Sequence, residues 1–232
     1  MMTAALADLP LSTPILEMRA ISKTFPGVKA LNDVNIALFP GEVTALIGEN
    51  GAGKSTLVKI LTGIYQSDEG EIHIDGKPVT FGNAQDAIDH GVTAIHQETV
   101  LFDELSVAEN IFIGHAPKTS LGLVNWKGVN ARALALLHSL ESNIDPRTRL
   151  KDLSIAQRHL VAIARALSVD ARIVIMDEPT AALSRKEVDD LFQIIKRLKA
   201  QGKAILFISH KFDEIYRIAD RYTVFRDGEM VG

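Results

Sequence analysis

The chain has 232 residues, of which 47% are hydrophobic and 23% are charged, a composition typical of one globular domain. It contains no cysteine, which excludes disulfides, thiolate metal sites and a cysteine nucleophile. Its net charge of −4 disfavours a surface that binds duplex DNA, and no apolar run is long enough to span a bilayer.

The first third of the chain is expected to be rich in strands. Residues 1–14 lack the basic region of a signal peptide and contain Asp8 and Pro10, so we expect a flexible tail there. Beyond it, apolar and polar residues alternate in three segments, and Asp75-Gly76 follows the last of them as a hairpin turn. The alternating segments are 16–20, 34–38 and 72–74.

A glycine-rich segment between an apolar strand and a helix is the clearest chemical motif. The strand is predicted at 43–47 and the helix at 55–62. The eight residues that join them match the phosphate-binding pattern G-x-x-x-x-G-K-[ST]. They read Gly48-Glu49-Asn50-Gly51-Ala52-Gly53-Lys54-Ser55. Strand, loop and helix in this order predict a nucleotide site.

Each part of this motif has a physical role. Glycines let the backbone N–H groups wrap around a phosphate, and the helix N-terminus adds a positive end. Lys54 is expected to reach the β- and γ-phosphates, the Ser55 hydroxyl to bind Mg²⁺, and Thr56 to add a hydroxyl near the α- and β-phosphates. The alternative is a glycine-rich turn that binds nothing, which the complete pattern disfavours.

From about residue 106 to 167 the pattern becomes helical, which predicts a helical insert near 101–165. Ser106-Val107-Ala108-Glu109 is a capping box that begins it, and Ser154 with Gln157 forms a second one. The second helix start also exposes N–H groups and a hydroxyl, which are able to grip a phosphate on another molecule.

Strands and helices then alternate, which predicts an α/β core. The run 173–176 is apolar throughout, as in a doubly covered parallel strand, and 204–208 is a second such strand. A capping box at Ser184 begins the helix between them. Residues 222–225 are expected to form a strand that turns at Asp227-Gly228 into a pairing strand at 230–232, where the chain stops at a natural end or a trimmed one.

Two carboxylates follow the first of these buried strands. Asp177 is expected to hold Mg²⁺, and Glu178, on the opposite side of the pleat, to act as a general base on water. The alternative is a pair of solvated carboxylates at a strand end. The phosphate-binding loop favours the functional interpretation.

Gln97 and His210 are candidate site residues that stand alone, so the sequence evidence for each is weaker than for a motif of several residues. Gln97 follows an apolar stretch and precedes the helical insert, and His210 follows the strand at 204–208. A lone Gln or His is more often structural. Because strand ends face one cleft, His210 is nonetheless expected to hydrogen-bond a γ-phosphate or the attacking water.

Taken together, these motifs resemble the ATP-binding cassette ATPases of transporters. The resemblance covers the chain from about Ile15. The corresponding segments are Gly48–Ser55 (Walker A), Gln97 (Q-loop), Leu153–Gln157 (signature), Asp177-Glu178 (end of Walker B) and His210 (switch histidine). It implies a P-loop NTPase (RecA-like) core with an antiparallel β subdomain and a helical insert, forming one domain over 15–232. It also implies that Phe25 stacks on adenine, the alternative being a small-core aromatic.

The chain departs from the general family pattern in two places. Ile155 and Ala156 replace both glycines of the usual Leu-Ser-Gly-Gly-Gln signature, and Ser184 stands where the D-loop usually ends in Asp. Both departures resemble the monosaccharide-importer subfamily, as do 96–98 and 208–211. In that subfamily two cassettes share one chain, so this chain corresponds to the N-terminal cassette. Its signature residues Ser154 and Gln157 would then serve the ATP of a partner cassette.

The resemblance therefore implies an ATPase, with ATP and Mg²⁺, that powers sugar import from the cytoplasmic face of the plasma membrane. The implied partners are a second nucleotide-binding domain, permease subunits and, indirectly, a periplasmic sugar-binding protein, with no nucleic acid. One alternative is a soluble cassette ATPase of DNA repair or translation, although no coiled coil or basic arm is visible. Another is a regulatory module without turnover, against which Glu178 and His210 argue.

Overall fold

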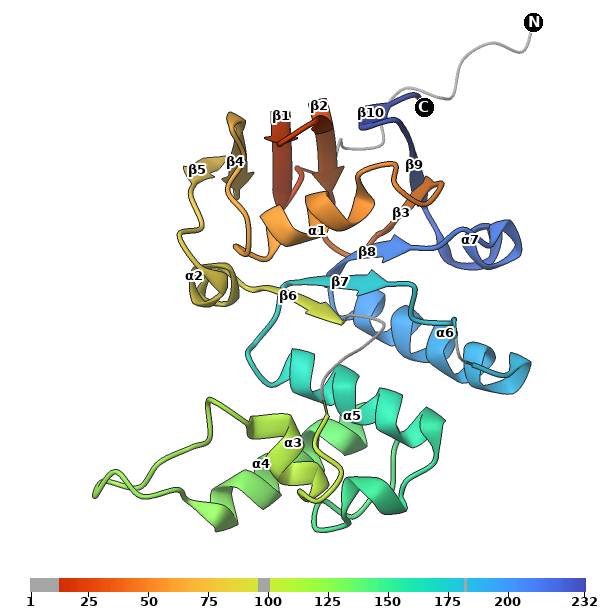
Figure 1. The fold of residues 1–232 in the computed structure, drawn as a ribbon. Helices are drawn as coiled ribbons and strands as arrows, with labels where there is room; N and C mark the ends of the chain where they lie inside the picture. The colour runs from red at the N-terminus through yellow and green to blue at the C-terminus, as the bar shows by residue number, and fades with distance from the viewer. Residues whose placement is uncertain (1–12, 96–100, 182) are drawn as a thin grey trace, which may run out of the picture.

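An antiparallel sheet and a mostly parallel sheet form the upper part of the molecule, and a group of helices lies beneath them (Figure 1). The computed structural model describes residues 13–95, 101–181 and 183–232. The antiparallel sheet has the strand order β2-β1-β4-β5. Its strands are β1 (Leu16–Phe25), β2 (Val28–Leu38), β4 (Glu69–Ile74) and β5 (Lys77–Val79).

The second sheet has six strands in the order β10-β9-β3-β8-β7-β6, and all neighbours are parallel except β10 and β9. Its strands are β3 (Val43–Gly48), β6 (Val92–Ile95), β7 (Ile173–Asp177), β8 (Ala204–Ile208), β9 (Arg221–Arg226) and β10 (Glu229–Met230). Because β3, β8 and β7 are parallel neighbours, the loops that follow them emerge at one edge of the sheet. The expected last strand at 230–232 begins one residue earlier, at Glu229.

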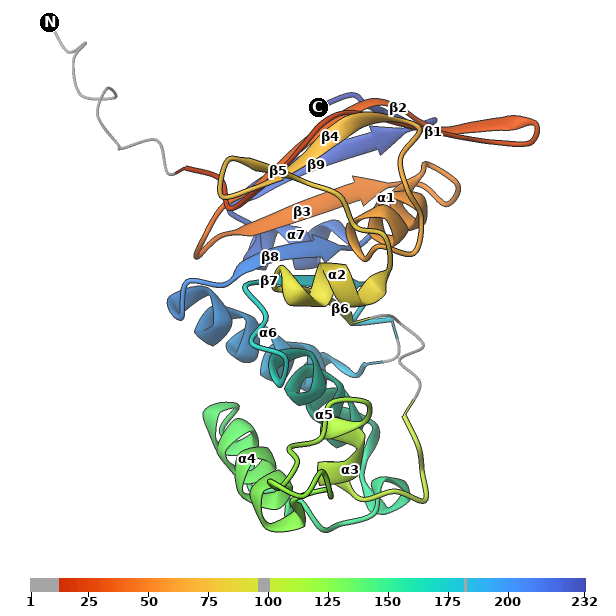
Figure 2. The ribbon, with the colours of Figure 1, turned by 90° about the vertical axis from the view of Figure 1, so that its left-hand side faces the viewer.

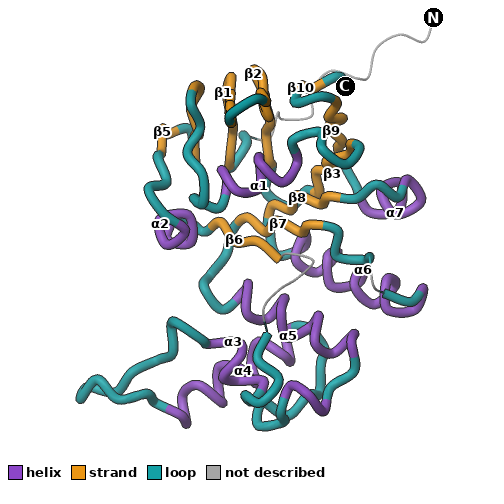
Figure 3. Tube along the Cα trace, viewed as in Figure 1, coloured by secondary structure: helices purple, strands orange, loops and turns teal. Residues whose placement is uncertain are grey.

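Helices cover both faces of the six-stranded sheet, as the tube in Figure 3 and the turned view in Figure 2 show. The helices of the described residues are α1 (Lys54–Leu61), α2 (Ala84–Asp89), α3 (Val107–Phe112), α4 (Trp126–Ser139), α5 (Ile155–Leu167), α6 (Arg185–Ala200) and α7 (Phe212–Ile218), with a short 3-10 helix at Leu150–Asp152, and of these α3 and α4 lie beyond α5, away from the sheet. Helices α3, α4 and α5 occupy the segment where a helical insert was expected, and α5 runs past the expected boundary at 165 to Leu167.

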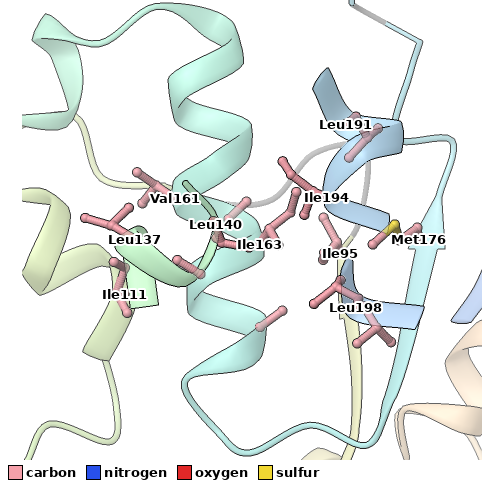
Figure 4. Packing of buried hydrophobic residues seen from close by; sticks show 14 of the residues in the cluster. Ile95, Ile111, Leu137, Leu140, Val161, Ile163, Met176, Leu191, Ile194 and Leu198 are labelled. Atoms are coloured by element: carbon pink, nitrogen blue, oxygen red, sulfur yellow. The ribbon is translucent and has the colours of Figure 1, made fainter. Parts of the chain in front are cut away.

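Strand β7, which lies between β8 and β6, shows why this sheet needs cover on two sides. Ile173 and Ile175 are fully buried among β1, β2 and α1, whereas Val174 and Met176 are fully buried on the side of α5 and α6. Side chains alternate across a strand, so an apolar run fills both faces. Figure 4 shows Met176 packed with Leu191, Ile194 and Leu198 of α6, next to Ile163 of α5. This core ties the helical part to the sheet.

The three predicted capping boxes are confirmed. In each, the N-cap serine accepts a hydrogen bond from the backbone of the fourth residue, whose side chain accepts one from the serine N–H. They begin α3 at Ser106, α5 at Ser154 and α6 at Ser184. Of the tail predicted at 1–14, residues 1–12 lie outside the described residues.

Candidate functional site

The glycine-rich loop Gly48–Ser55 leaves the end of β3 and enters α1, as predicted. Gly51 and Gly53 have φ angles of +86° and +104°, which disfavour any residue with a side chain. At Gly53 space is also short, because a Cβ there would lie 2.5 Å from the carbonyl oxygen of Ala30. The loop is therefore shaped by glycines against the neighbouring β2.

The positive end of α1 faces this loop. Lys54 is buried, and its ammonium donates hydrogen bonds to the carbonyl oxygens of Gly48 at 2.6 Å and Glu49 at 2.8 Å. Gly53 at the N-cap offers no side-chain cap, and the first turn holds no acidic residue. The unpaired N–H groups, the helix dipole and Lys54 together make an electropositive anion site.

One pocket of about 680 Å³ unites this loop with the carboxylates that follow β7. Its walls include Lys54, Ser55 and Thr56 from the loop side, and Asp177 and Glu178 from the strand β7, which is separated from β3 by β8. The sequence expectation that these residues share a site is therefore met in space. The other lining residues are Phe25, Val28, Lys29, Ala30, Asn50, Gly51, Gly53, Asp227 and Gly228.

The conformation of Glu178 differs from the expected one. It was expected to continue the pleat of the strand, on the face opposite Asp177. Instead β7 ends at Asp177, and Glu178 has a φ of +47°, in the left-handed region. Its N–H still donates to the carbonyl oxygen of Ile208 at 3.0 Å, so the residue stays bound to β8 while its side chain takes a new direction.

His210 lies beside Glu178, in the loop that follows β8. Its Nδ1 is 3.1 Å from Oε1 of Glu178, and the imidazole is exposed while the carboxylate is half-buried. The two groups come from loops 32 positions apart in the sequence. The prediction that strand ends bring His210 to the same cleft as the carboxylates agrees with this geometry.

A buried glutamate that sequence reasoning missed joins these two loops. Glu214 of α7 is only 7% exposed, and its carboxylate accepts hydrogen bonds from Thr180 Oγ1 at 2.6 Å and Ser209 Oγ at 3.2 Å. Lys211 Nζ lies 3.1 Å from its other oxygen. These partners compensate the burial of the charge. Glu214 therefore connects the segment after Glu178 to the segment that carries His210, and no local pattern marks it in the sequence.

Phe25 has features expected of an aromatic that stacks on adenine and features expected of an aromatic in a small core, the two interpretations that the sequence left open. It lines the pocket and is half-buried, as a residue that meets a ligand ring would be. Its ring also packs edge-on against Tyr65, with centroids 5.3 Å apart. The aromatic ring is thus held at the pocket wall by a neighbour.

The remaining candidates lie elsewhere. Gln97 falls outside the described residues. Ser154 and Gln157 lie at the N-terminus of α5 and are not among the residues that line the pocket. The structure therefore does not bring the signature residues to the phosphate loop of the same chain.

The residues at the pocket fit a magnesium ion bound together with phosphates. Ser55 and Asp177 offer a hydroxyl and a carboxylate on the wall of one pocket, and Mg²⁺ prefers oxygen ligands. Magnesium in phosphate sites takes only one or two protein groups. Consistently, the described part of the chain holds no cluster of three or more side chains suited to caging a metal by themselves.

Within the described ranges, no helix combines the length and the apolar character that crossing a bilayer requires. A groove of about 430 Å³ lies on the side of α2, where the sheet meets the helical part. Its lining comes from α2, β6, the residues 113–115 that follow α3, and α5.

Comparison with known sequences finds one matching transporter family. The profile of the family described as ABC transporter matches residues 31–181, more than half of the chain. Among curated proteins, the ribose import ATP-binding protein RbsA 1 of Agrobacterium fabrum is 75% identical over 99% of this chain and 45% of its own length. RbsA 2 of Streptomyces avermitilis is 49% identical over 94% of this chain and 43% of its own length. The chain thus spans less than half the length of these relatives.

Solved structures share the fold. The ADP conformation of an ATP-binding cassette of an ABC transporter superposes with a TM-score of 0.86 at 30% identity, over 95% of this chain and 91% of that one. A dimeric post-hydrolysis cassette bound to ADP and phosphate gives a TM-score of 0.78 at 26% identity, over 94% of this chain and 97% of that one.

Proposed function

Because the chain belongs to the ABC transporter family, we propose that it is an ATP-binding and ATP-hydrolysing domain that powers the import of a sugar. One observation carries this proposal. A single pocket gathers an electropositive glycine loop, an oxygen-ligand pair and a carboxylate hydrogen-bonded to an imidazole. These are the parts that phosphoryl transfer to water requires.

The loop residues bind and orient the triphosphate. The amides of Gly51 to Ser55 and the Lys54 ammonium neutralise phosphate charge, Thr56 adds a hydroxyl, and Phe25 meets the adenine. Ser55 and Asp177, with Gln97 as a further ligand, hold Mg²⁺. When bound, the metal ion neutralises the charge that develops on the β- and γ-oxygens.

Glu178 is the proposed general base, because its carboxylate lines the pocket and is placed to accept a proton from an attacking water. His210 holds this carboxylate in place through Nδ1. Because a neutral imidazole has only one N–H, His210 can donate from Nδ1 to the Glu178 carboxylate and from Nε2 to the γ-phosphate only as the imidazolium. Both side chains are thereby assigned to the reacting end of the nucleotide.

The position of Ser154 and Gln157 supports a composite site. They lie outside the pocket, at a helix N-terminus that is suited to phosphate on a second molecule. A second nucleotide-binding domain would supply the matching signature for this pocket. The curated relatives are about twice as long as this chain, which is consistent with a second cassette fused to the first.

The groove between α2 and α5 is the proposed docking site for a permease subunit. It spans the junction of the sheet and the helical part, so a segment seated there would move when the helical part rotates over bound ATP. A domain docked on a permease in this way would lie at the cytoplasmic face of the plasma membrane, with a periplasmic sugar-binding protein as an indirect partner. Relatives named for ribose import support a monosaccharide as the cargo.

The test is phosphate release from Mg-ATP by the complete two-cassette chain, with wild type and Glu178→Gln compared. We expect Glu178→Gln to bind a fluorescent ATP analogue as tightly as wild type does. Its rate of ATP hydrolysis should be lower by a factor on the order of 10² or more. Glu69→Gln, an exposed carboxylate on β4, serves as the matched control. Hydrolysis by Glu178→Gln at the wild-type rate would show that the assigned base is wrong.

A further inference from the structure

A short hairpin projects from the helical part between α3 and α4 (Figure 1). Within this 117–126 hairpin, Lys118 and Val124 form an antiparallel bridge. The N–H of Thr119 donates to the carbonyl oxygen of Leu123 at 2.7 Å. Backbone hydrogen bonds therefore define the hairpin and hold the side chains at its turn in the solvent.

The hairpin exposes apolar side chains. Leu121 is 84% exposed, Leu123 is 67% exposed and Trp126 is 53% exposed. Four of the fourteen large apolar side chains that are exposed in the described residues lie in this hairpin, Val124 being the fourth. Single exposed apolar residues are ordinary, whereas a cluster on one projection indicates a contact surface.

Within the segment that carries this cluster the charged side chains have one sign, although Asp145, beyond it in the sequence, lines a pocket with Trp126 and Lys127. From residue 110 to residue 140 the sequence contains no Asp or Glu, although the whole chain has a net charge of −4. The same segment carries Lys118, Lys127 and Arg132, all exposed. Exposed leucine and tryptophan beside basic side chains are typical of segments that lie in the interface of anionic membranes.

The placement of the hairpin agrees with such a partner. The residues 113–115, which precede it, line the groove proposed for the permease. In Figure 1 the hairpin projects on the same side of the molecule as α2, which forms another wall of that groove. If the permease docks there, this side of the domain faces the bilayer, so this step depends on the proposed function.

We propose that the 117–126 hairpin contacts an anionic bilayer. Leu121 and Leu123 enter the headgroup layer, and Lys118 and Lys127 pair with lipid phosphates. The contact is a peripheral one that adds to docking on the permease, and a cytoplasmic loop of the permease is the competing occupant that the experiment distinguishes.

The experiment is flotation of the 232-residue chain with vesicles of phosphatidylcholine, with and without phosphatidylglycerol. We expect binding only to the vesicles that contain phosphatidylglycerol, and loss of that binding as salt is raised. Trp126 is the one tryptophan of the chain, so its emission reports on the hairpin and is expected to move to shorter wavelength on binding.

Three variants separate the apolar and the basic contributions to vesicle binding. Leu121→Ser and Leu123→Ser are each expected to weaken binding about tenfold, because each removes a leucine from the interface. Lys118→Gln with Lys127→Gln is expected to abolish the preference for phosphatidylglycerol. Tyr216→Ser, an equally exposed apolar site on α7, is the matched control and should bind as wild type does.

Three results would overturn the proposal. They are absence of binding to both kinds of vesicle, equal binding by Leu121→Ser and wild type, and binding only when the permease is present in the vesicles. ATP hydrolysis by the complete two-cassette chain, measured for wild type and the leucine variants, separates this outcome from the failure of the proposed function. If ATP hydrolysis is intact but no vesicle binding is seen, only the proposed membrane contact of the hairpin is contradicted, and the proposed function stands.

Discussion

The N-termini of α1 and α5 are built in opposite ways. At α1 the N-cap is Gly53, no side chain caps the first turn, and the neighbouring cation is Lys54. At α5 the N-cap Ser154 accepts a hydrogen bond from the N–H of Gln157 at 3.3 Å, and Gln157 Oε1 accepts one from the Ser154 N–H at 3.0 Å. The N-terminus of α1 leaves its backbone N–H groups free to bind a ligand. At the N-terminus of α5, side chains of the cap already accept hydrogen bonds from two backbone N–H groups.

This difference separates two kinds of phosphate site. The α1 end, inside a pocket with Asp177 and Glu178, has enough groups to bind a nucleotide within one chain. The α5 end has a completed cap and an exposed isoleucine, Ile155, next to it, so it offers little unless a second surface supplies the phosphate. On the proposed function, one chain would hold one complete phosphate-binding loop and would contribute the start of α5 to the site of a partner cassette.

The largest effect is expected from Gly53→Ala, which alters the glycine N-cap of α1. The new Cβ would meet the Ala30 carbonyl oxygen at 2.5 Å in a left-handed conformation, which we expect to cost about 3 kcal/mol of unfolding free energy. Gly51→Ala is the matched control. Its φ is +86° but nothing lies within 4 Å, so about 1 kcal/mol is expected. Equal losses in urea unfolding would argue against the close approach.

Lys54→Met removes the cation from the same site, together with its hydrogen bonds to the carbonyl oxygens of Gly48 and Glu49. We expect ATP affinity to fall about 100-fold, since a buried charge partner of the phosphates is lost. Isothermal titration calorimetry measures this change. Lys59→Met, in the last turn of the same helix and over the ring of Tyr65, should leave ATP affinity unchanged. An unchanged affinity in Lys54→Met would remove the lysine from the proposed site.

Ser154→Ala tests the role of the N-cap of α5. Loss of the cap is expected to lower the unfolding free energy by about 1 kcal/mol while the ATP affinity of this chain stays unchanged. Ser184→Ala removes the same capping box from α6 and should cost a similar amount. In the complete two-cassette chain only Ser154→Ala should slow hydrolysis. Equal hydrolysis by the two variants would show that Ser154 is a cap and nothing more.

The smallest effect is expected from Asp75→Asn, far from both helix starts. Arg172 binds both carboxylate oxygens of Asp75, at 2.7 and 2.8 Å, and this hydrogen bonding holds the pKa of Asp75 below its usual range. Both side chains are about half exposed, so solvent screening limits the loss to about 0.5 kcal/mol at pH 7. Asparagine tolerates the positive φ of this turn position.

The sign of the pH dependence follows from the lowered pKa. The folded protein binds the Asp75 proton less tightly than the unfolded chain does, so the stabilisation is present above the unfolded pKa of about 3.9 and disappears as the pH falls through the lower folded value. The free energy difference between wild type and Asp75→Asn should therefore shrink as the pH falls through the range below about 4. A difference that grows in that range would contradict the assignment.

The features that sequence reasoning predicted are those that a few adjacent residues determine. The capping boxes at Ser106, Ser154 and Ser184 each depend on four consecutive residues, and the glycine loop depends on eight. The proximity of Asp177 to Lys54 was also predictable, because parallel strands direct their following loops to one edge. Local chemistry and one topological rule thus gave most of the site.

The features that it missed depend on distant parts of the chain. Ala30 and Gly228 reach the loop only because β2, β9 and β10 pair as they do. Glu214 appears in the sequence as an ordinary helical acid, and only the folded chain shows that it joins the loops after β7 and β8. The backbone of Glu178 was misjudged because the strand ends one residue before it, which the apolar pattern does not mark.

The contact between Glu178 and His210 has a further consequence for tolerance to mutation. Glu178 is bonded through its N–H to the end of β8, and His210 follows that same strand, so the spacing of the two side chains is set by the ladder between neighbouring strands. Neighbouring strands lie about 4.8 Å apart in every sheet, and this separation barely changes when a core side chain is replaced. The chain should therefore lose folding stability through core substitutions well before it loses the alignment of this pair.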